Sequence, residues 1–500
     1  MGEPGTATMH ANAASTGATT NPGPGSGHLS INGTNLGAVF PTILMGSDGL
    51  IVAVGTKVTD RTPTVFLLDP TTLNTLAAPM QLFKSTTSDL AGGIYSYLDN
   101  NDNLVLVNAE GYLQRISHTQ SGNSSWTLNV DSSVQIGYPD VVGLVPDYQG
   151  RVWFATAQGT SSASGAVIGY YDPSTSVTAV FALPAGEQVA NSISSSPDGV
   201  AVASTAALYL FTAGTNGPQQ LWRNTYDAGP GRKPGQLSWG TGATPAFFGP
   251  KTGYEYLTIT DNAAPQENIL VYETLSGNLV GSVPLLTAGV NSGNEDAAIA
   301  VGHSIYYPST YGYPYPKSAE NPEESVPVSA PFVGGMQRVD VLDGCLRTVW
   351  SNNSIASAAE PRLSVADNLI YTVGLDTSTG VYSLITIDPD TGRLLSSAPY
   401  GSSTEDNPLQ MVGMISPDGV LYQGTELGLM RVEAQAPTTT DPGLAVLHKE
   451  SNGTPPQKAK KGKGAKKSSA SKSARAKSKS TTGSTEKKSG TKKLKKKKKA

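Results

Sequence analysis

Carboxylate and amide side chains recur along the chain, each shortly before a β-rich stretch. If those stretches surround a common axis, their oxygens converge and repel one another unless a hard cation or a polyhydroxy ligand lies among them. Calcium takes such oxygens. The alternative is that Asp and Asn simply start turns. The candidate ligand or metal residues are Asp89, Asp140, Asn191, Asn294, Glu295, Asp296, Glu360 and Asp406.

A second candidate is a tyrosine-rich and proline-rich insertion at residues 306–316. Tyrosine offers a flat apolar ring with a polar tip at low entropic cost, which suits a sugar or peptide surface, and proline stiffens the loop that carries it. The alternative is a loop that merely packs on the fold. The aromatic candidates are Tyr306, Tyr307, Tyr311, Tyr313 and Tyr315.

The common catalytic signatures are missing from the sequence. It contains no Gly-x-Ser-x-Gly elbow, no phosphate loop and no His-Glu-x-x-His pair. His118 and His303 are too far apart in sequence to imply a pair, and each is expected at the surface or satisfied in the core. Cys345 is the single cysteine, so no intramolecular disulfide forms, and a buried thiol is expected. Catalytic residues are therefore not assigned, and whether the protein is an enzyme stays open.

The elements that would position these residues are best defined at residues 360–400. Short strands are predicted at residues 361–365, 369–373 and 381–387, and a fourth begins at Arg393 after the tight-turn residues 388–392. Four antiparallel strands in about 40 residues are the length of one β-propeller blade.

The same unit recurs along the chain, marked by a short turn between its first two strands. Eight such turns at near-constant spacing predict an all-β, eight-bladed β-propeller with seven blades as the alternative, and helix content near zero. The turns are Asp48-Gly49, Asp102-Asn103, Gln149-Gly150, Asp198-Gly199, Thr252-Gly253, Gly302-His303, Asp367-Asn368 and Asp418-Gly419.

The boundaries follow from composition and strand count. Residues 1–27 consist mainly of Gly, Ala, Thr, Asn and Pro and are predicted to be disordered, because they bury too little apolar surface to offset ordering entropy. Residues 28–436 form the propeller. The eighth unit lacks a fourth strand, and residues 29–35 are the natural donor, because a closed ring leaves no open edge.

The region 437–500 is predicted to be a disordered, lysine-rich, low-complexity tail. Residues 451–500 carry a balance of +18, which leaves −22 for the rest of a chain whose net charge is −4. Such a tail attracts polyanions non-specifically, and no aromatics interleave for base stacking. An anionic cell-envelope polymer is the expected partner, and the alternative is a solvated tail that touches the acidic body.

Some segments resemble known propellers. Residues 341–350, which end in Trp350, and the turn 388–392 resemble the repeats of the quinoprotein alcohol dehydrogenase-like superfamily, in which eight blades are usual. Residues 240–245, 256–261 and 335–340 resemble uncharacterised exported actinobacterial propellers, which brings no known activity. Quinone-dependent members use adjacent cysteines beside the cofactor, and the lone Cys345 counts against a PQQ cofactor.

Two functions fit these features. The first is an exported ligand- or surface-binding propeller, a monomer that takes a carbohydrate or peptide and attaches to anionic polymers through its tail. The second is an enzyme, a lactonase-like hydrolase or quinoprotein-like dehydrogenase with a divalent ion such as calcium at the channel mouth. A secreted or cell-surface location is expected on composition, although no signal sequence stands near Met1. No run reaches the roughly 20 apolar residues of a membrane span.

Overall fold

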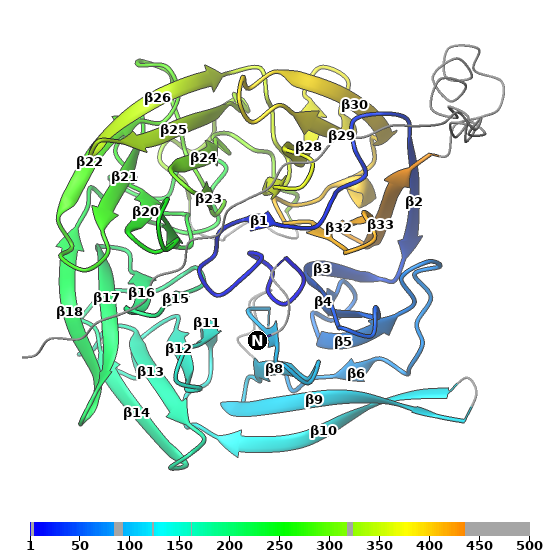
Figure 1. The fold of residues 1–500 in the computed structure, drawn as a ribbon, viewed down its shortest axis with the longest axis vertical. Coiled ribbons are helices and arrows are strands. Elements are labelled where there is room, and N and C mark those ends of the chain that lie inside the picture. Colours follow the sequence, from blue (N-terminus) through cyan, green and yellow to red (C-terminus); the bar gives the residue numbers. More distant parts are fainter. Residues whose placement is uncertain (2–4, 85–93, 123–124, 162, 318–323, 436–500) are drawn as a thin grey trace, which may run out of the picture. The chain divides into compact units, whose positions relative to one another are not determined.

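The computed structural model describes residues 1, 5–84, 94–122, 125–161, 163–317 and 324–435. Residues 1–436 form one compact unit, and the lysine-rich tail lies outside the described residues. Within the described residues, eight sheets follow one another around a ring, which confirms the eight-bladed β-propeller (Figure 1). The helical content of these residues is one 3-10 turn, η1 (Thr404–Asp406).

Blades 1 to 4 come from consecutive stretches of chain, with the first strand of each innermost. Blade 1 is β3 (Ala38–Met45), β4 (Ile51–Lys57), β5 (Pro63–Leu68) and β6 (Met80–Gln81); blade 2 is β7 (Tyr97–Leu98), β8 (Leu104–Val107), β9 (Tyr112–Ser121) and β10 (Ser125–Gln135); blade 3 is β11 (Val141–Pro146), β12 (Val152–Thr156), β13 (Val167–Asp172) and β14 (Val177–Ala182); blade 4 is β15 (Ser194–Ser196), β16 (Gly199–Ala203), β17 (Ala207–Gly214) and β18 (Gly217–Thr225).

Blades 5 and 6 repeat this order, whereas blades 7 and 8 each take one strand from the N-terminal region. Blade 5 is β19 (Ala246–Phe248), β20 (Tyr256–Thr260), β21 (Asn268–Glu273) and β22 (Leu279–Pro284); blade 6 is β23 (Ile299–Val301), β24 (Ser304–Pro308), β25 (Met336–Leu342) and β26 (Cys345–Asn352); blade 7 is β27 (Arg362–Ser364), β28 (Leu369–Asp376), β29 (Val381–Ile387) and β30 (Leu394–Gly401), with β1 (Ala18–Thr19) added inside; blade 8 is β31 (Met414–Ile415), β32 (Leu421–Gly424), β33 (Gly428–Ala434) and β2 (Leu29–Asn35).

The predicted turns are confirmed at the first hairpin of every blade. The loop between β29 and β30 shows the local mechanism of the longer turns: Asp388 Oδ1 accepts a hydrogen bond from the N–H of Asp390 at 2.9 Å, and Oδ2 accepts from the Thr391 hydroxyl. Gly392 completes the turn at φ +68°, where a side chain would be strained. These aspartates therefore serve the fold.

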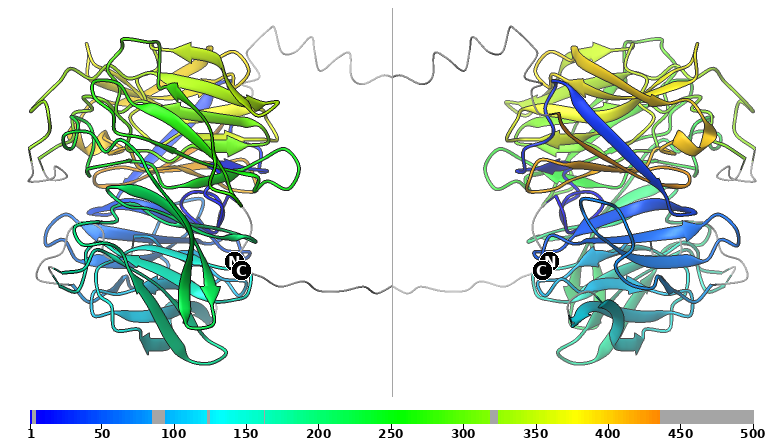
Figure 2. Two further views of the ribbon diagram at one scale, coloured as in Figure 1. Left: turned by 90° about the vertical axis from the view of Figure 1, so that its left-hand side faces the viewer. Right: turned by 90° about the vertical axis from the view of Figure 1, so that its right-hand side faces the viewer.

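The ring closes as the sequence predicts. β2 pairs antiparallel with β33, with Ile31 opposite Val432, and so supplies the outer strand that the eighth unit lacks. Figures 1 and 2 show the blue strand β2 alongside the orange strand β33, although the two are far apart in sequence. Pairing the ends of the propeller covers two edges that would otherwise be free to associate.

Tryptophans dock neighbouring blades at two places. Trp350 in β26 donates its indole N–H to the carbonyl of Pro389 at 2.9 Å, and its ring covers Gly392, where a Cβ would lie 2.5 Å away. Trp222 in β18 makes the equivalent bond to Thr274 at 2.8 Å over Gly277. The sequence singled out only Trp350 for this role, so Trp222 is an addition.

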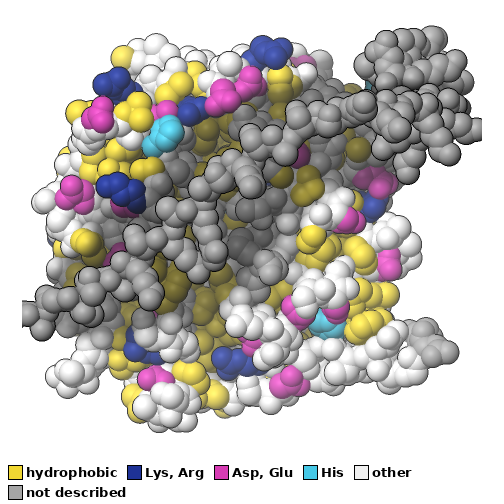
Figure 3. Space-filling view, in the orientation of Figure 1, with side chains coloured by type: hydrophobic (Ala, Val, Ile, Leu, Met, Phe, Trp, Pro, Cys, Tyr) yellow, Lys and Arg dark blue, Asp and Glu magenta, His cyan; other side chains and the backbone are white. Residues whose placement is uncertain are grey.

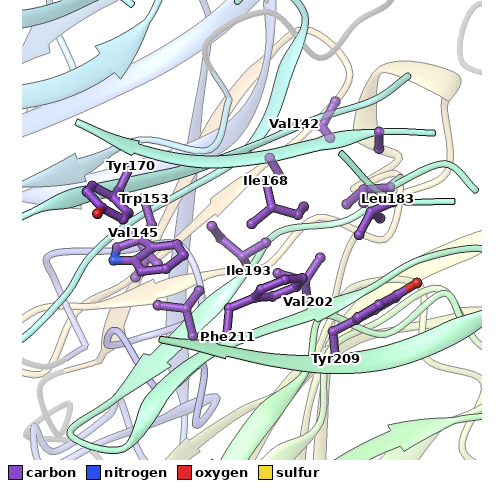
Figure 4. Close-up of a cluster of buried hydrophobic side chains, with 14 of the residues drawn as sticks. Val142, Val145, Trp153, Ile168, Tyr170, Leu183, Ile193, Val202, Tyr209 and Phe211 are labelled. Atoms are coloured by element: carbon purple, nitrogen blue, oxygen red, sulfur yellow. The ribbon is translucent and has the colours of Figure 1, made fainter. Parts of the chain in front are cut away.

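The core consists of apolar layers between successive blades. The layer between blades 3 and 4 contains Trp153, Ile168, Ile193 and Phe211, each at most 2% exposed (Figure 4). Burying such side chains stabilises the fold by about 1.5–3 kcal/mol each. Successive side chains of an inner strand point to opposite faces of the blade, so each inner strand contributes to the apolar layers on both sides of its blade.

The N-terminal segment corrects the expectation that residues 1–27 are disordered. Residues 5–25 lie at the centre of the ring, where β1 pairs in parallel with β27 (Figure 1). Small side chains made this course hard to foresee, because they bury little area by themselves. They fit here because the narrow axis of the ring has no room for larger ones.

Two further expectations concern exposure. Cys345 is exposed at the start of the outer strand β26 and is not the buried thiol that was expected, because outer strands face solvent on one side. No helix in the described part of the chain is long and apolar enough to cross a membrane.

Candidate functional site

The channel of the propeller is lined by the N-terminal segment, here residues 5–25. The innermost strands of six blades donate backbone N–H groups to its carbonyls. The bonds run from Met45 to Thr6, Leu98 to Ala7, Ser195 to Ala13, Phe247 to Ala14, Ala300 to Thr16, Leu363 to Gly17 and Val365 to Thr19, at 2.7–3.1 Å. In blade 8, the Ile415 carbonyl accepts from the Asn21 amide at 2.9 Å. Any axial site is therefore built partly by this segment.

Glu360, just before β27, lies at the centre of this arrangement. Its Oε1 is 3.0 Å from His10 Nδ1, and its Oε2 accepts from the N–H of Ala297 at 3.3 Å. His10 Nε2 is in turn 3.3 Å from the Thr244 hydroxyl. The order hydroxyl, imidazole, carboxylate is that of a catalytic triad. Thr244 is only 3% exposed, however, so in this arrangement the chain of bonds holds the segment and offers no hydroxyl to a substrate.

Asp296 is the least satisfied group in the channel. It is 1% exposed, and neither of its carboxylate oxygens has a hydrogen-bond partner. Burial raises the pKa of Asp296 well above its usual range, and the charges of Glu360 and Glu295 raise it further. Asp296 therefore keeps its proton at neutral pH unless a cation enters beside it.

Glu295 is held by the loop that follows blade 4. Its Oε2 accepts from the N–H of Leu237 at 2.9 Å, and its Oε1 lies 3.5 Å from the Ser238 hydroxyl. Burial raises the pKa of Glu295 to about 8, although these N–H contacts act in the opposite direction. Asp296 and Glu295, whose raised pKa values favour the protonated form, therefore lie beside Glu360, which is paired with His10.

Arg362 places a positive charge near Glu360. The side chain is 2% exposed; its Nε donates to the carbonyl of Gly413 at 3.1 Å and its Nη2 to the carbonyl of Met9, while Nη1 has no partner. Burial lowers the pKa of Arg362 to about 10, against the attraction of Glu360. The guanidinium therefore stays charged at neutral pH and fastens the N-terminal segment to blade 7.

The structure brings together part of the predicted oxygen set. Glu295, Asp296 and Glu360 interact electrostatically, and Asn294 shapes their loop by donating its amide to the Asp296 carbonyl at 2.7 Å. Among the described residues, no group of three or more His, Cys, Asp or Glu is placed to hold a metal ion. The calcium site thus stays a prediction.

The remaining members of that set have other surroundings. Asn191 donates to the carbonyl of Gly242 at 2.8 Å and so ties blade 4 to the next loop. Asp140 is exposed in a turn at φ 57°. Asp406 caps η1 through the N–H and hydroxyl of Ser403. Asp89 lies outside the described residues. The surroundings of Asn191, Asp140 and Asp406 therefore fit the alternative in which these residues shape turns and loops.

Sequence reasoning missed His10, Thr244 and Arg362. Residues 1–27 contain one charged side chain, Glu3, whereas disordered segments are usually rich in charge. The low charge of residues 1–27 was therefore the available sequence signal that the segment is buried. The two histidines that were considered lie elsewhere and apart: His118 Nε2 is 2.7 Å from Asp48, and His303 Nε2 is 3.3 Å from Asp340.

The tyrosine-rich insertion is not an exposed aromatic surface. Tyr306 and Tyr307 belong to β24, and all five candidate tyrosines are at most 8% exposed. The rings of Tyr313 and Tyr315 pack edge to face at 4.8 Å, and the Tyr313 hydroxyl donates to Asn407. The packing alternative therefore holds, because the prolines and Gly312 fold the loop back onto the body.

A cleft opens beside this buried tyrosine layer. Its volume is about 350 Å³, and it lies where the loop after β24 meets the β28–β29 hairpin and the residues after β30. The lining residues are Pro314, Pro316, Leu375, Thr377, Gly380, Tyr382, Ser402, Ser403, Thr404 and Asn407. This volume falls within the range of about 300–1,000 Å³ that is usual for small-molecule sites.

The lining of the cleft is neutral and rich in hydroxyl groups. Thr377, Ser402 and Thr404 are exposed, with no hydrogen bond from their hydroxyls to the described residues. Asn407 is buried at the base of the cleft, where its Oδ1 accepts from the Tyr313 hydroxyl and from the N–H of Leu409. Tyr382, stacked on Tyr400 at 6.3 Å, adds an apolar wall.

No family model matches the chain. An uncharacterised protein of Archaeoglobus fulgidus is 22% identical over 333 residues, which cover 59% of this chain and 61% of that protein. The match thus spans less than two thirds of the relative's length.

Solved structures are similar over most of the chain at low identity. A functionally unknown protein from Desulfotomaculum acetoxidans shares 13% identity, with 69% of this chain and 95% of that chain covered and a TM-score of 0.39. A streptogramin B lyase shares 11%, with 81% and 98% covered and a TM-score of 0.38. A europium-containing methanol dehydrogenase shares 11%, with 85% and 97% covered and a TM-score of 0.37. At these identities the similarity concerns the fold alone.

Proposed function

We propose that the protein is a binding module whose propeller takes a neutral polyhydroxy ligand, of the saccharide class, in the cleft of blade 7. The observation that carries the proposal is the composition of that cleft. None of its lining residues is charged, so neither a metal ion nor a phosphate finds a counter-charge there.

The groups that line the cleft complement the hydroxyl groups and the apolar C–H faces of a sugar. The hydroxyls of Thr377, Ser402 and Thr404 supply the hydrogen bonds that ring hydroxyls need, while Tyr382, Pro314 and Pro316 supply flat apolar walls for the C–H faces. The hydrogen bond from Tyr313 to Asn407 and the packed tyrosine rings hold the base of the cleft in place. A site held in place before binding loses less entropy when the ligand arrives.

A saccharide screen on the full chain tests this proposal. Thr377 lines the cleft, and Thr379 lies in the same exposed turn but does not. T377W fills the cleft and abolishes saccharide binding measured by calorimetry, whereas T379W binds like the parent. Equal binding by the two variants, or no bound saccharide in the screen, would contradict the proposal.

The second part of the proposal concerns place and attachment. The exported protein is retained at the cell envelope through its tail, whose charge of +18 over residues 451–500 favours anionic polymers. On the described part of the face in Figure 3, acidic and basic side chains are interspersed.

An enzyme with a divalent ion in the channel is the second candidate, and Asp296 is the observation that favours it. A buried carboxylate without any partner is costly, and a hard cation among Asp296, Glu295 and Glu360 would satisfy it. Calorimetry with calcium on the full chain tests this, with E295Q and E360Q weakening the binding. A parent protein that binds no divalent ion, or turns over no lactone, sugar or alcohol, ends this candidacy.

A further inference from the structure

The central channel has the properties of a receptor for a peptide. Its innermost strands present backbone N–H groups toward the axis, and the N-terminal segment accepts hydrogen bonds from seven of them in six blades. β1 also extends blade 7 by parallel pairing with β27. Adding a chain to the free edge of a sheet is a common way in which proteins bind peptides. We infer that the channel is a peptide-binding site and that residues 5–25 are its tethered, separable ligand.

The site selects small side chains. Ala7, Ala11, Ala13, Ala14 and Ala18 are each at most 8% exposed. A Cβ on Gly17 would lie 2.8 Å from the Ala298 carbonyl, and one on Gly23 would lie 2.5 Å from the ring of Tyr371. The chemical class of the ligand is therefore a looped peptide of Ala, Gly, Ser and Thr.

Two polar anchors set the register of this peptide. His10 lies between Glu360 and Thr244 at 3.0 and 3.3 Å, and Arg362 donates to the carbonyl of Met9. All three receptor side chains are at most 6% exposed, where bonds to charged groups are strong. A peptide of small residues with one histidine thus has one preferred position in the channel.

The connection to β2 is short and exposed, and its last residue, His28, accepts a hydrogen bond from the N–H of Gln435 at 2.8 Å. Ser26, Gly27 and His28 are exposed, and a Cβ on Gly27 would meet nothing within 4 Å. β2 itself belongs to blade 8 and does not need the segment for its pairing with β33. Residues 26–28 therefore act as a tether that keeps the ligand at a high effective concentration beside its site.

The test separates ligand from receptor after folding. A protease recognition sequence is inserted between Ser26 and Gly27 of the full chain, the folded protein is cut, and the retention of the fragment is followed by gel filtration. Three versions are compared: the parent, A14L at a buried position, and T20L at an exposed position. The parent and T20L fragments remain with the ring, and the A14L fragment leaves it.

A labelled synthetic peptide of residues 1–25, which exchanges with the fragment of the cut parent, gives the affinity by fluorescence anisotropy. Because overpacking costs about 1–3 kcal/mol, the A14L peptide binds about fivefold to 150-fold more weakly, and the T20L peptide binds like the parent. An H10A peptide binds about tenfold more weakly through the lost anchor. The peptide measurements use only the parent ring, so they still test the inference if the uncut A14L chain does not fold.

Three results would overturn the inference. One is release of the parent fragment with no binding of the labelled peptide to a ring that keeps its melting temperature. Another is unfolding of the ring when the fragment leaves, which would make the segment an integral part of the core. The third is equal binding of the A14L and T20L peptides, since a selective channel must distinguish a buried from an exposed position.

Discussion

Asp296 and Glu295 show how burial sets the chemistry of the channel. Two adjacent acids whose pKa values are raised stay protonated near neutral pH, so the segment that lines the channel does not face two further negative charges. Glu360 has other neighbours, because His10 and the guanidinium of Arg362 lie near it and both contact the N-terminal segment or belong to it.

The raised pKa values predict that stability falls with rising pH. Burial raises the pKa of Glu295, and that of Glu267 just before β21, to about 8 in the folded protein, against about 4.3 when unfolded. The folded state therefore binds more protons between these values, and their contribution is present below about pH 4.3 and lost as the pH rises through 8. The melting temperature is expected to drop by several degrees from pH 6 to pH 9.

Substitution of Glu295 tests whether this residue contributes to the pH dependence of stability. E295Q removes one titrating group and makes the drop in melting temperature smaller. E405Q in the exposed turn η1 is the matched control and leaves the drop as it is in the parent. A parent protein that is equally stable at pH 6 and pH 9 would contradict the assigned protonation states.

At the scale of the element, β2 carries the closure of the ring. Ile31 faces the layer between blades 7 and 8, where it packs near Tyr371 and Val432, whereas the next residue, Asn32, is exposed. Ile31 is partly buried, so I31D places a charge against an apolar layer, and a loss of about 1–2 kcal/mol in the free energy of unfolding is expected. Urea denaturation measures it.

Asn32 provides the control for this prediction. N32D places the same carboxylate one position along, on the solvent face, and changes stability by less than about 0.5 kcal/mol. If I31D is as stable as N32D, another segment closes the ring, and the pairing of β2 with β33 contributes little.

The outer strand β26 offers a simpler test at the same scale. Cys345 is exposed beside the hairpin glycine Gly344. A maleimide reagent should label it fully in the folded protein, and the labelled protein should keep its melting temperature because no packed contact is lost. Protection of the thiol until denaturant is added would contradict its place on the outer strand.

At the scale of the whole molecule, body and tail differ in charge and in kind. The eighteen lysines of residues 451–500 occur singly and in short runs among Gly, Ser, Ala and Thr, so we expect binding to a polyanion to be governed by counterion release. A chain truncated after His448 is expected to lose retention on heparin and on isolated envelope, with an unchanged melting temperature. Retention of the full chain falls steeply as salt rises.

A chain with a shuffled tail is the control for that prediction. It keeps the same residues in another order and should bind as the parent does, because non-specific electrostatic attraction depends on the number of charges and not on their order. Envelope binding by the truncated protein equal to that of the full chain would show that the propeller itself attaches.

The sequence by itself determined the repeated elements. Asp, Asn, Gly and Pro act locally: Asp388 builds its turn with its own neighbours, and alternating apolar residues such as those of β29 make a strand wherever they are placed. For that reason the eight hairpins, the blade count and the pairing of β2 were predictable. Glu295, Asp296 and Glu360 were predicted at the mouth of the channel because each lies shortly before an innermost strand.

Only the tertiary structure decided what occupies the axis and which surfaces are free. Ala11, His10 and Gly17 have no strong local preference, and their burial arises from the inner edges of blades that are hundreds of residues away in sequence. Tyr313 and Tyr315 have the composition of a binding loop, yet long-range packing buries them and leaves the cleft beside Asn407 instead. Such outcomes depend on distant contacts, and no short stretch of sequence contains them.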